Sequence, residues 1–127
     1  MAIMTDWRQM CKGAEGVTVD GDKVSVEFSN QRRHRVLVRE TEEAYELSAI
    51  VARPFLIRNL VDVSLRAWQR NRSTQLMGFR LDKRGRLVGE AWIPKLGLTR
   101  EEFLLFIHRL ASECDHFEYL LTGKDRE

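Results

Sequence analysis

From position 17 to position 52 the chain alternates apolar and polar residues with a period of two, which is typical of half-buried β-strands. The first two apolar runs flank Asp20-Gly21-Asp22, and Gly and Asp tolerate the backbone angles of a tight turn, so the pattern predicts a β-hairpin. Short polar connections separate the next two runs, as consecutive antiparallel strands require. The expected strands cover residues 17–19, 24–28, 34–40 and 44–52.

Three other stretches carry apolar residues at the spacing of three and four that is typical of helices. A short first helix is expected over residues 5–12, and a central amphipathic helix over residues 54–70. The last helix begins at a capping box formed by Thr99 and Glu102 and extends to Gly123. The apolar side of the central helix would carry Leu56, Ile57, Leu60, Val61, Ser64, Ala67 and Trp68, and the seam of the last helix Phe103, Ile107, Leu110, Cys114, Phe117 and Leu121.

Between these two helices, residues 78–94 predict a second hairpin around the turn Asp82-Lys83-Arg84-Gly85. The expected register puts large apolar side chains on both of its faces. One face, which should cover the core, carries Met77, Phe79, Leu81, Leu87, Ala91 and Ile93. The opposite face pairs Leu76 with Trp92, Gly78 with Glu90, and Arg80 with Val88.

Two interpretations of this opposite face are open. Trp92 either covers the sheet edge as a partly buried aromatic, helped by the first helix, or the face receives another chain, because exposed aromatic patches rimmed by charge mark interaction sites. Gly78 and Gly89 would let a partner's backbone approach closely. The candidate peptide-binding residues are therefore Leu76, Gly78, Arg80, Val88, Glu90 and Trp92.

The order of elements, α-β-β-β-β-α-β-β-α, predicts an α+β fold with a single-layer antiparallel sheet and helices packed on it. The 127 residues, 43% of them hydrophobic, fit one domain over residues 1–127, with a core at 15–123 and a flexible tail at 124–127. Two cysteines form no disulfide framework, and no stretch approaches the roughly 20 apolar residues of a membrane span. A cytoplasmic protein is expected.

The net charge of +2 is too small to indicate a nucleic-acid-binding protein by itself. A local basic run, QRRHRVLVR, nevertheless makes nucleic acid an alternative partner, contacted by Arg32, Arg33, Arg35 and Arg39. No aromatic residues interleave with these arginines, although single-strand binding usually needs stacking rings on the same surface. A solvated strand face paired with the acidic residues 40–43 is the favoured interpretation.

No set of residues indicates a catalytic, metal or cofactor site. Cys114 and His116 could supply at most two ligands, whereas a zinc site needs three or four. The same pair has no third group to orient it as a nucleophile and base. No Gly-rich phosphate-binding loop is present. We therefore expect a protein that is not an enzyme.

Three segments, VARPFLIRNLVDVSLRAWQRN, MGFRLDKRGRLVGEAWIPKLGLTREEF and LASECDHFEYLLTG, resemble the YbjN-like proteins and their relatives among the bacterial type III secretion chaperones. The likeness covers roughly residues 15–123. It implies a secretion-chaperone-like fold, commonly a homodimer, that binds extended polypeptide on its sheet or groove without enzyme activity or cofactor. Secretion chaperones are usually acidic, so the slightly basic charge of this chain favours a housekeeping peptide-binding role. The resemblance to YbjN-like proteins, which are often described as regulators, keeps a regulatory role open.

Excess apolar surface also suggests a homodimer. Leu76, Val88 and Trp92 on the hairpin, and Ile57, Val61 and Trp68 on the central helix, exceed what a minimal core stripe needs. The sequence does not decide between a helix and a sheet edge as the contact.

Overall fold

The computed structural model describes residues 6–58, 60, 62–74 and 76–123. Its elements are α1 (Trp7–Cys11), β1 (Val17–Asp20), β2 (Lys23–Glu27), β3 (Arg33–Glu40), β4 (Ala44–Ala52), α2 (Pro54–Ile57), α3 (Val63–Ser73), β5 (Gly78–Leu81), β6 (Leu87–Pro94) and α4 (Arg100–Thr122). The expected tail at 124–127, together with Thr5 and Val61, lies outside the described residues. No described helix has the length and apolar character needed to span a bilayer.

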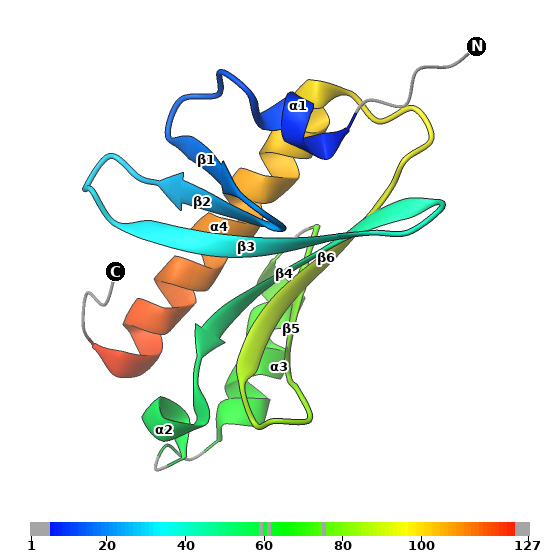
Figure 1. Cartoon of the computed structure of the whole chain (residues 1–127). Coiled ribbons are helices and arrows are strands. Elements are labelled where there is room, and N and C mark those ends of the chain that lie inside the picture. The colour runs from blue at the N-terminus through cyan, green and yellow to red at the C-terminus, as the bar shows by residue number, and fades with distance from the viewer. Residues whose placement is uncertain (1–5, 59, 61, 75, 124–127) are drawn as a thin grey trace.

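The six strands form one antiparallel sheet in the order β1-β2-β3-β4-β6-β5. The long helix α4 packs across β2, β3, β4 and β6, while α1 packs on α4 and β1 (Figure 1). Helix α3 lies against β5 and is tied to α4 by an ion pair between Arg70 and Glu113 at 3.0 Å. The α+β fold with helices packed on a single antiparallel sheet is confirmed.

The core lies between α4 and the sheet face that it covers, which we call the inner face. Alternate strand residues point inward, because successive side chains of a strand lie on opposite faces. Buried inner-face residues include Val24, Val26, Val36, Val38, Leu47, Val51, Phe79, Leu87 and Ile93. The predicted α4 seam meets them, and the Thr99–Glu102 capping box begins that helix as expected.

Gly89 lies on this inner face, where the expected pairing with Phe79 puts it. A Cβ atom at Gly89 would lie 2.5 Å from the Cys114 sulfur and 3.2 Å from atoms of Leu110 and Phe79. The missing side chain therefore lets α4, and not an outside chain, approach β6 closely.

The expected central helix is wrong in one respect, because two helices replace it. Asp62 adopts a left-handed conformation with φ of 62°, which separates α2 from α3. In one unbroken helix Ile57 and Val63 would point about 120° apart, since each residue turns about 100°. The break lets both side chains enter the core. As a result Val63 and Ala67 are buried, whereas Trp68 is 55% exposed.

The second hairpin has the predicted register for its four ladder pairs, from Gly78–Glu90 to Leu81–Leu87. The expected pair of Leu76 and Trp92 is not formed, because Leu76 has a φ of 73° and β5 begins only at Gly78. Leu81 was expected in the core but is 39% exposed, since it ends the strand beside the turn.

The outer edge of β5 is closed by a side chain of α3. Asn71 accepts a hydrogen bond from the backbone N–H of Phe79 at 2.6 Å and donates one to its carbonyl at 2.9 Å. The amide group thus replaces a neighbouring strand at that residue. An unprotected edge of this kind is a template for pairing with another chain.

Candidate functional site

The sheet face opposite α4, here called the outer face, is hollowed over β6 and β5. This hairpin hollow has a volume of about 740 Å³. All six residues predicted for peptide binding line it: Leu76, Gly78, Arg80, Val88, Glu90 and Trp92. The structure therefore brings the predicted set together, although Leu76 arrives from the loop before β5 and not from a paired strand position.

Trp92 is the largest exposed group of the hairpin hollow, with 61% of its surface accessible. Helix α1 packs on α4 and β1, so the interpretation in which α1 helps to cover Trp92 is wrong. Val88 was expected to be exposed but is only 6% accessible. Ile50 of β4 and Arg80 of β5 flank it on the same face, so neighbouring side chains cover it.

Four of the charged side chains that line the hairpin hollow form two ion pairs, Arg80 with Glu90 and Arg86 with Asp82. Arg80 donates two hydrogen bonds to the Glu90 carboxylate, both at 2.8 Å, and these raise the pKa of Arg80. Arg86 donates to Asp82 at 2.7 Å. Burial alone would raise the pKa of Asp82, but hydrogen bonds from the backbone and side chain of Arg86 hold it below its usual value. The hollow therefore offers an apolar anchor in a charge-balanced rim.

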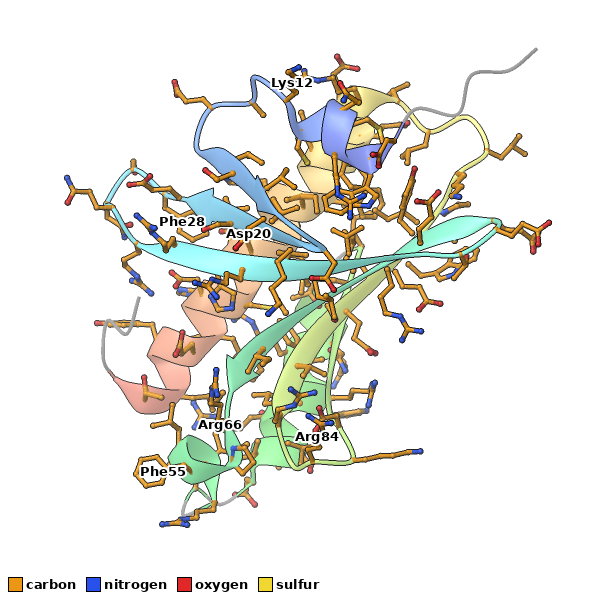
Figure 2. All side chains as sticks on the ribbon, viewed as in Figure 1. Lys12, Asp20, Phe28, Phe55, Arg66 and Arg84 are labelled. Carbon is orange, nitrogen blue, oxygen red and sulfur yellow. The ribbon has the colours of Figure 1, made fainter. Side chains whose placement is uncertain are left out.

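A second hollow, of about 910 Å³, lies over β3 and the end of β4. It shares Leu37, Ser48, Arg86 and Val88 with the hairpin hollow, so the two are continuous. Its cationic lining residues are Lys23, Arg33, Arg35, Arg53 and Arg86, and we call it the basic hollow. Phe55, which projects from α2 in Figure 2, lines its far end.

The structure divides the four arginines proposed for nucleic acid. Arg33, Arg35 and Arg39 are exposed on the outer face. Arg32 is not part of that group, because it turns to α4 and contacts the Asp115 carboxylate at 2.6 Å. The acidic loop does not pair with the strand as expected, since Glu40 instead accepts a hydrogen bond from Lys95 at 2.6 Å.

Asp115 belongs to a buried cluster with His34 and Glu118. The His34 ring donates from Nε2 to the carbonyl of Ile50 at 2.8 Å, since a carbonyl oxygen only accepts. Its Nδ1 faces Oδ1 of Asp115 at 3.7 Å, and neither atom has a hydrogen-bond partner. Ligand atoms of the three residues lie within 4.8 Å of one another, as metal binding would require. Arg32 already supplies a positive charge to Asp115, so we assign the cluster to an ion pair.

Neither cysteine has the properties of a catalytic nucleophile. Burial raises the pKa of Cys11 to about 11 and raises that of Cys114 further. A thiol reacts as its thiolate, so both groups are poorly reactive at neutral pH. Cys114 is fully buried while His116 is exposed, and the two do not form a pair.

Comparison of the fold with solved structures finds chains from protein–protein complexes. Matching chains occur in the ExsC–ExsE complex (TM-score 0.59, 20% identity, 91% of this chain and 92% of that chain). Another belongs to the heterodimeric ExoU–SpcU complex from the type III secretion system of Pseudomonas aeruginosa (TM-score 0.61, 17% identity, 83% and 87% covered). A third belongs to the HopA1–SchA chaperone–effector complex (TM-score 0.53, 12% identity, 93% and 88% covered).

This chain has a type III secretion chaperone-like fold. No family model and no curated protein sequence matches it. The likeness therefore concerns the arrangement of helices and strands, and the sequence signals for that arrangement were the two hairpins and the capping box. The basic hollow was not predicted, because its residues come from β2, β3, β4, α2 and β6 and share no local pattern.

Proposed function

We propose that this protein is a non-enzymatic, chaperone-like domain that binds an extended segment of another polypeptide in the hairpin hollow. The observation that carries the proposal is Trp92, a large exposed ring in a hollow on the sheet face that α4 leaves free. Rigid aromatic groups of this kind dominate binding energies at protein interfaces. Each of the three similar structures is a complex of two proteins, which supports a polypeptide partner.

The test begins with purification from the native host and mass-spectrometric identification of any co-purifying polypeptide. A synthetic copy of its bound segment is then titrated by fluorescence anisotropy. Trp92→Ala should weaken binding about thirtyfold or more, the equivalent of about 2 kcal/mol. Leu105→Ala, which truncates an exposed apolar side chain on α4, is the control and should bind like the wild type. Undiminished binding by Trp92→Ala would contradict the choice of surface.

Gly78→Val provides a second test of the same surface. A Cβ at Gly78 has the Asn71 side chain as its nearest neighbour at 3.7 Å, an ordinary contact, so the variant should fold. Its added bulk stands in the hairpin hollow, where it should block a partner's backbone. A folded Gly78→Val protein with full affinity would argue against close backbone approach.

We further propose that the protein is a homodimer that uses α3. Leu65 and Trp68 lie three residues apart on this helix and are both exposed, so they form one apolar face. Two residues of the original expectation, Ile57 and Val88, are buried and do not contribute. Light scattering of the wild type should give twice the chain mass of 14.9 kDa. Trp68→Ala should weaken the dimer and lower the measured mass toward that of a single chain. A monomer at micromolar concentration would refute the dimer.

The YbjN-like relationship, a regulatory role and a cytoplasmic location also belong to this proposal. They are supported by the quoted sequence segments and by the two free, buried cysteines, which suit a reducing compartment.

A further inference from the structure

Strands β3 and β4 separate along half of their length. Their ladder runs from Glu40–Tyr45 to Leu37–Ser48 and ends there, although β3 begins four residues earlier, at Arg33, and β4 continues to Ala52. Residues 33–36 remain paired with β2, and residues 49–52 with β6, on their other sides. Figure 1 shows the two strands together at one end and diverging toward the other. The basic hollow lies over this gap.

Peptide groups of β3 point into the gap. The Val38 N–H donates to the Asp22 carbonyl, and the carbonyl of Arg32, just before β3, accepts from the Phe28 N–H. Even-numbered residues along this stretch therefore form their backbone hydrogen bonds toward β2. Because hydrogen bonding alternates along a strand, the N–H and C=O groups of Arg33 and Arg35 face the other way. They are directed at the place that β4 would occupy in a continuous sheet.

Two features keep the gap from closing. In a regular continuation Arg35 would pair with Ile50, but the Ile50 carbonyl instead accepts a hydrogen bond from the His34 ring at 2.8 Å. The pairing of β4 with β6 also shifts by one residue between Ile50 and Ala52, a bulge that bends the strand. The gap is thus a built feature with one open strand edge.

The rim of the gap is strongly positive. Lys23, Arg33, Arg35 and Arg53 line it, and none of them forms an ion pair with a described residue. Glu27 lies opposite Arg33 in the ladder but forms no ion pair with it. Among the described residues that line the hollow, Glu118 on the α4 side is the only acidic one. Leu37, Ile50 and Val88 add aliphatic side chains to the outer-face lining.

We propose that the gap between β3 and β4 binds an extended acidic segment of the partner polypeptide as an added strand, an inference that rests on the proposed function. Its backbone pairs with Arg33 and Arg35, and carboxylates at every second position meet their guanidinium groups on the outer face. The intervening side chains are small, since they point to the inner side of the gap, where the His34 ring reaches from β3 to the Ile50 carbonyl beside Ala49 and Val51. Nucleic acid fits less well, because Phe55 is the only Phe, Tyr or Trp side chain among the described lining residues that could stack on a base.

The experiment uses three labelled probe peptides of alternating sequence, Glu-Val, Gln-Val and Lys-Val, each flanked by Gly-Ser, and oligothymidylate of similar length. Against wild-type protein at low salt, the Glu-Val peptide should bind about tenfold more tightly than the Gln-Val peptide, or about threefold per arginine. Arg33→Ala/Arg35→Ala should abolish that preference. The control Arg84→Ala/Arg109→Ala removes the same amount of charge outside the hollow, from the hairpin tip at Arg84 (Figure 2) and from α4 at Arg109. This control should keep the preference for the Glu-Val peptide.

Amide hydrogen exchange supplies the second readout. Binding of the Glu-Val peptide should protect the amides of Arg33 and Arg35, while those of His34 and Val36 are already bonded to β2. Equal affinity for the Glu-Val and Gln-Val peptides, or no protection of Arg33 and Arg35, would overturn this inference and leave the proposed function standing. No binding of any peptide would overturn both. Preference for oligothymidylate that depends on Arg33 and Arg35 would replace the peptide with nucleic acid.

Discussion

Gly89→Ala is the substitution that tests most directly how α4 sits on the sheet, and therefore which face is free for a partner. Gly89 is buried on β6 beneath α4. The new Cβ would lie 2.5 Å from the sulfur of Cys114, whereas non-bonded carbon atoms prefer about 3.5–4.0 Å. Contacts of 3.2 Å to Leu110 and Phe79 block escape in the other directions.

The expected cost follows from that overlap. Cys114 has a short side chain on a long, well-packed helix, so relief of about 1 Å or more requires a shift of α4 or of β6. Overpacking of this kind costs about 1–3 kcal/mol, and we expect the upper end of that range. The midpoint of thermal unfolding should fall by about 10 °C in a domain of this size.

A double-mutant cycle identifies the sulfur as the cause. Cys114→Ala alone removes one buried atom and should cost about 1 kcal/mol. Because it also removes the atom that clashes, the combined Gly89→Ala/Cys114→Ala protein should be more stable than Gly89→Ala alone, with a coupling of about 2 kcal/mol. Denaturant unfolding monitored by circular dichroism measures all three variants.

Gly78→Ala is the matched control on the neighbouring strand, since its nearest contact is at 3.7 Å and its stability should change by less than about 0.5 kcal/mol. If Gly89→Ala were as stable as Gly78→Ala, or if the two changes at Gly89 and Cys114 were additive, α4 would not pack on β6 as described. The assignment of the opposite face to a partner would then lose its basis.

Three further changes test other parts of the site. Asp115→Ala should lower stability by about 2–3 kcal/mol in urea unfolding, because it leaves the partly buried Arg32 without its carboxylate, and Glu113→Ala, at a more exposed pair, should cost less. Asn71→Ala should lower the free energy of unfolding by about 2 kcal/mol, because it removes two hydrogen bonds to Phe79. It should also expose the edge of β5 and increase aggregation measured by light scattering, and unchanged stability would contradict the edge-closing role. Asp82→Asn should destabilise the hairpin only above about pH 4. Because the pKa of Asp82 is lower in the folded state, its carboxylate contributes to the free energy of unfolding above the unfolded-state pKa, and that contribution is lost as the pH falls through the folded-state pKa. A gap between wild type and Asp82→Asn that persists in acid would refute this account.

Local signals in the sequence predicted much of the fold. The capping box at Thr99 and Glu102 and the turn around Gly85 act within a few residues, so they placed α4 and the register of the second hairpin correctly. That register in turn brought Gly78, Arg80, Val88 and Glu90 of the hairpin hollow together, since alternation along paired strands decides which side chains share a face. Leu76 reaches the same hollow from the loop before β5.

The missed features depend on contacts between distant elements. A period of 3.6 continues through Asp62, and only the need to bury both Ile57 and Val63 makes a break favourable. Arg32 belongs with the other arginines in sequence, but its partner Asp115 lies 83 positions away on α4. The opening between β3 and β4 leaves no trace in hydrophobic alternation, because separated strands alternate in the same way as paired ones.

The two hollows together define a direction for a bound chain. They meet at Leu37, Ser48, Arg86 and Val88, so one extended segment can cross from Trp92 to the gap without leaving the outer face. In the hairpin hollow Arg80 pairs with Glu90 and Arg86 with Asp82, and in the proposed binding mode the contact of Trp92 with a ligand is mainly apolar. At the gap Arg33, Arg35 and Arg53 form no ion pair with a described residue, and the open backbone of β3 is proposed to accept an added strand. The proposed ligand therefore needs both an apolar anchor for Trp92 and an acidic extended stretch for the gap, separated by the few residues that cross Leu37, Ser48, Arg86 and Val88.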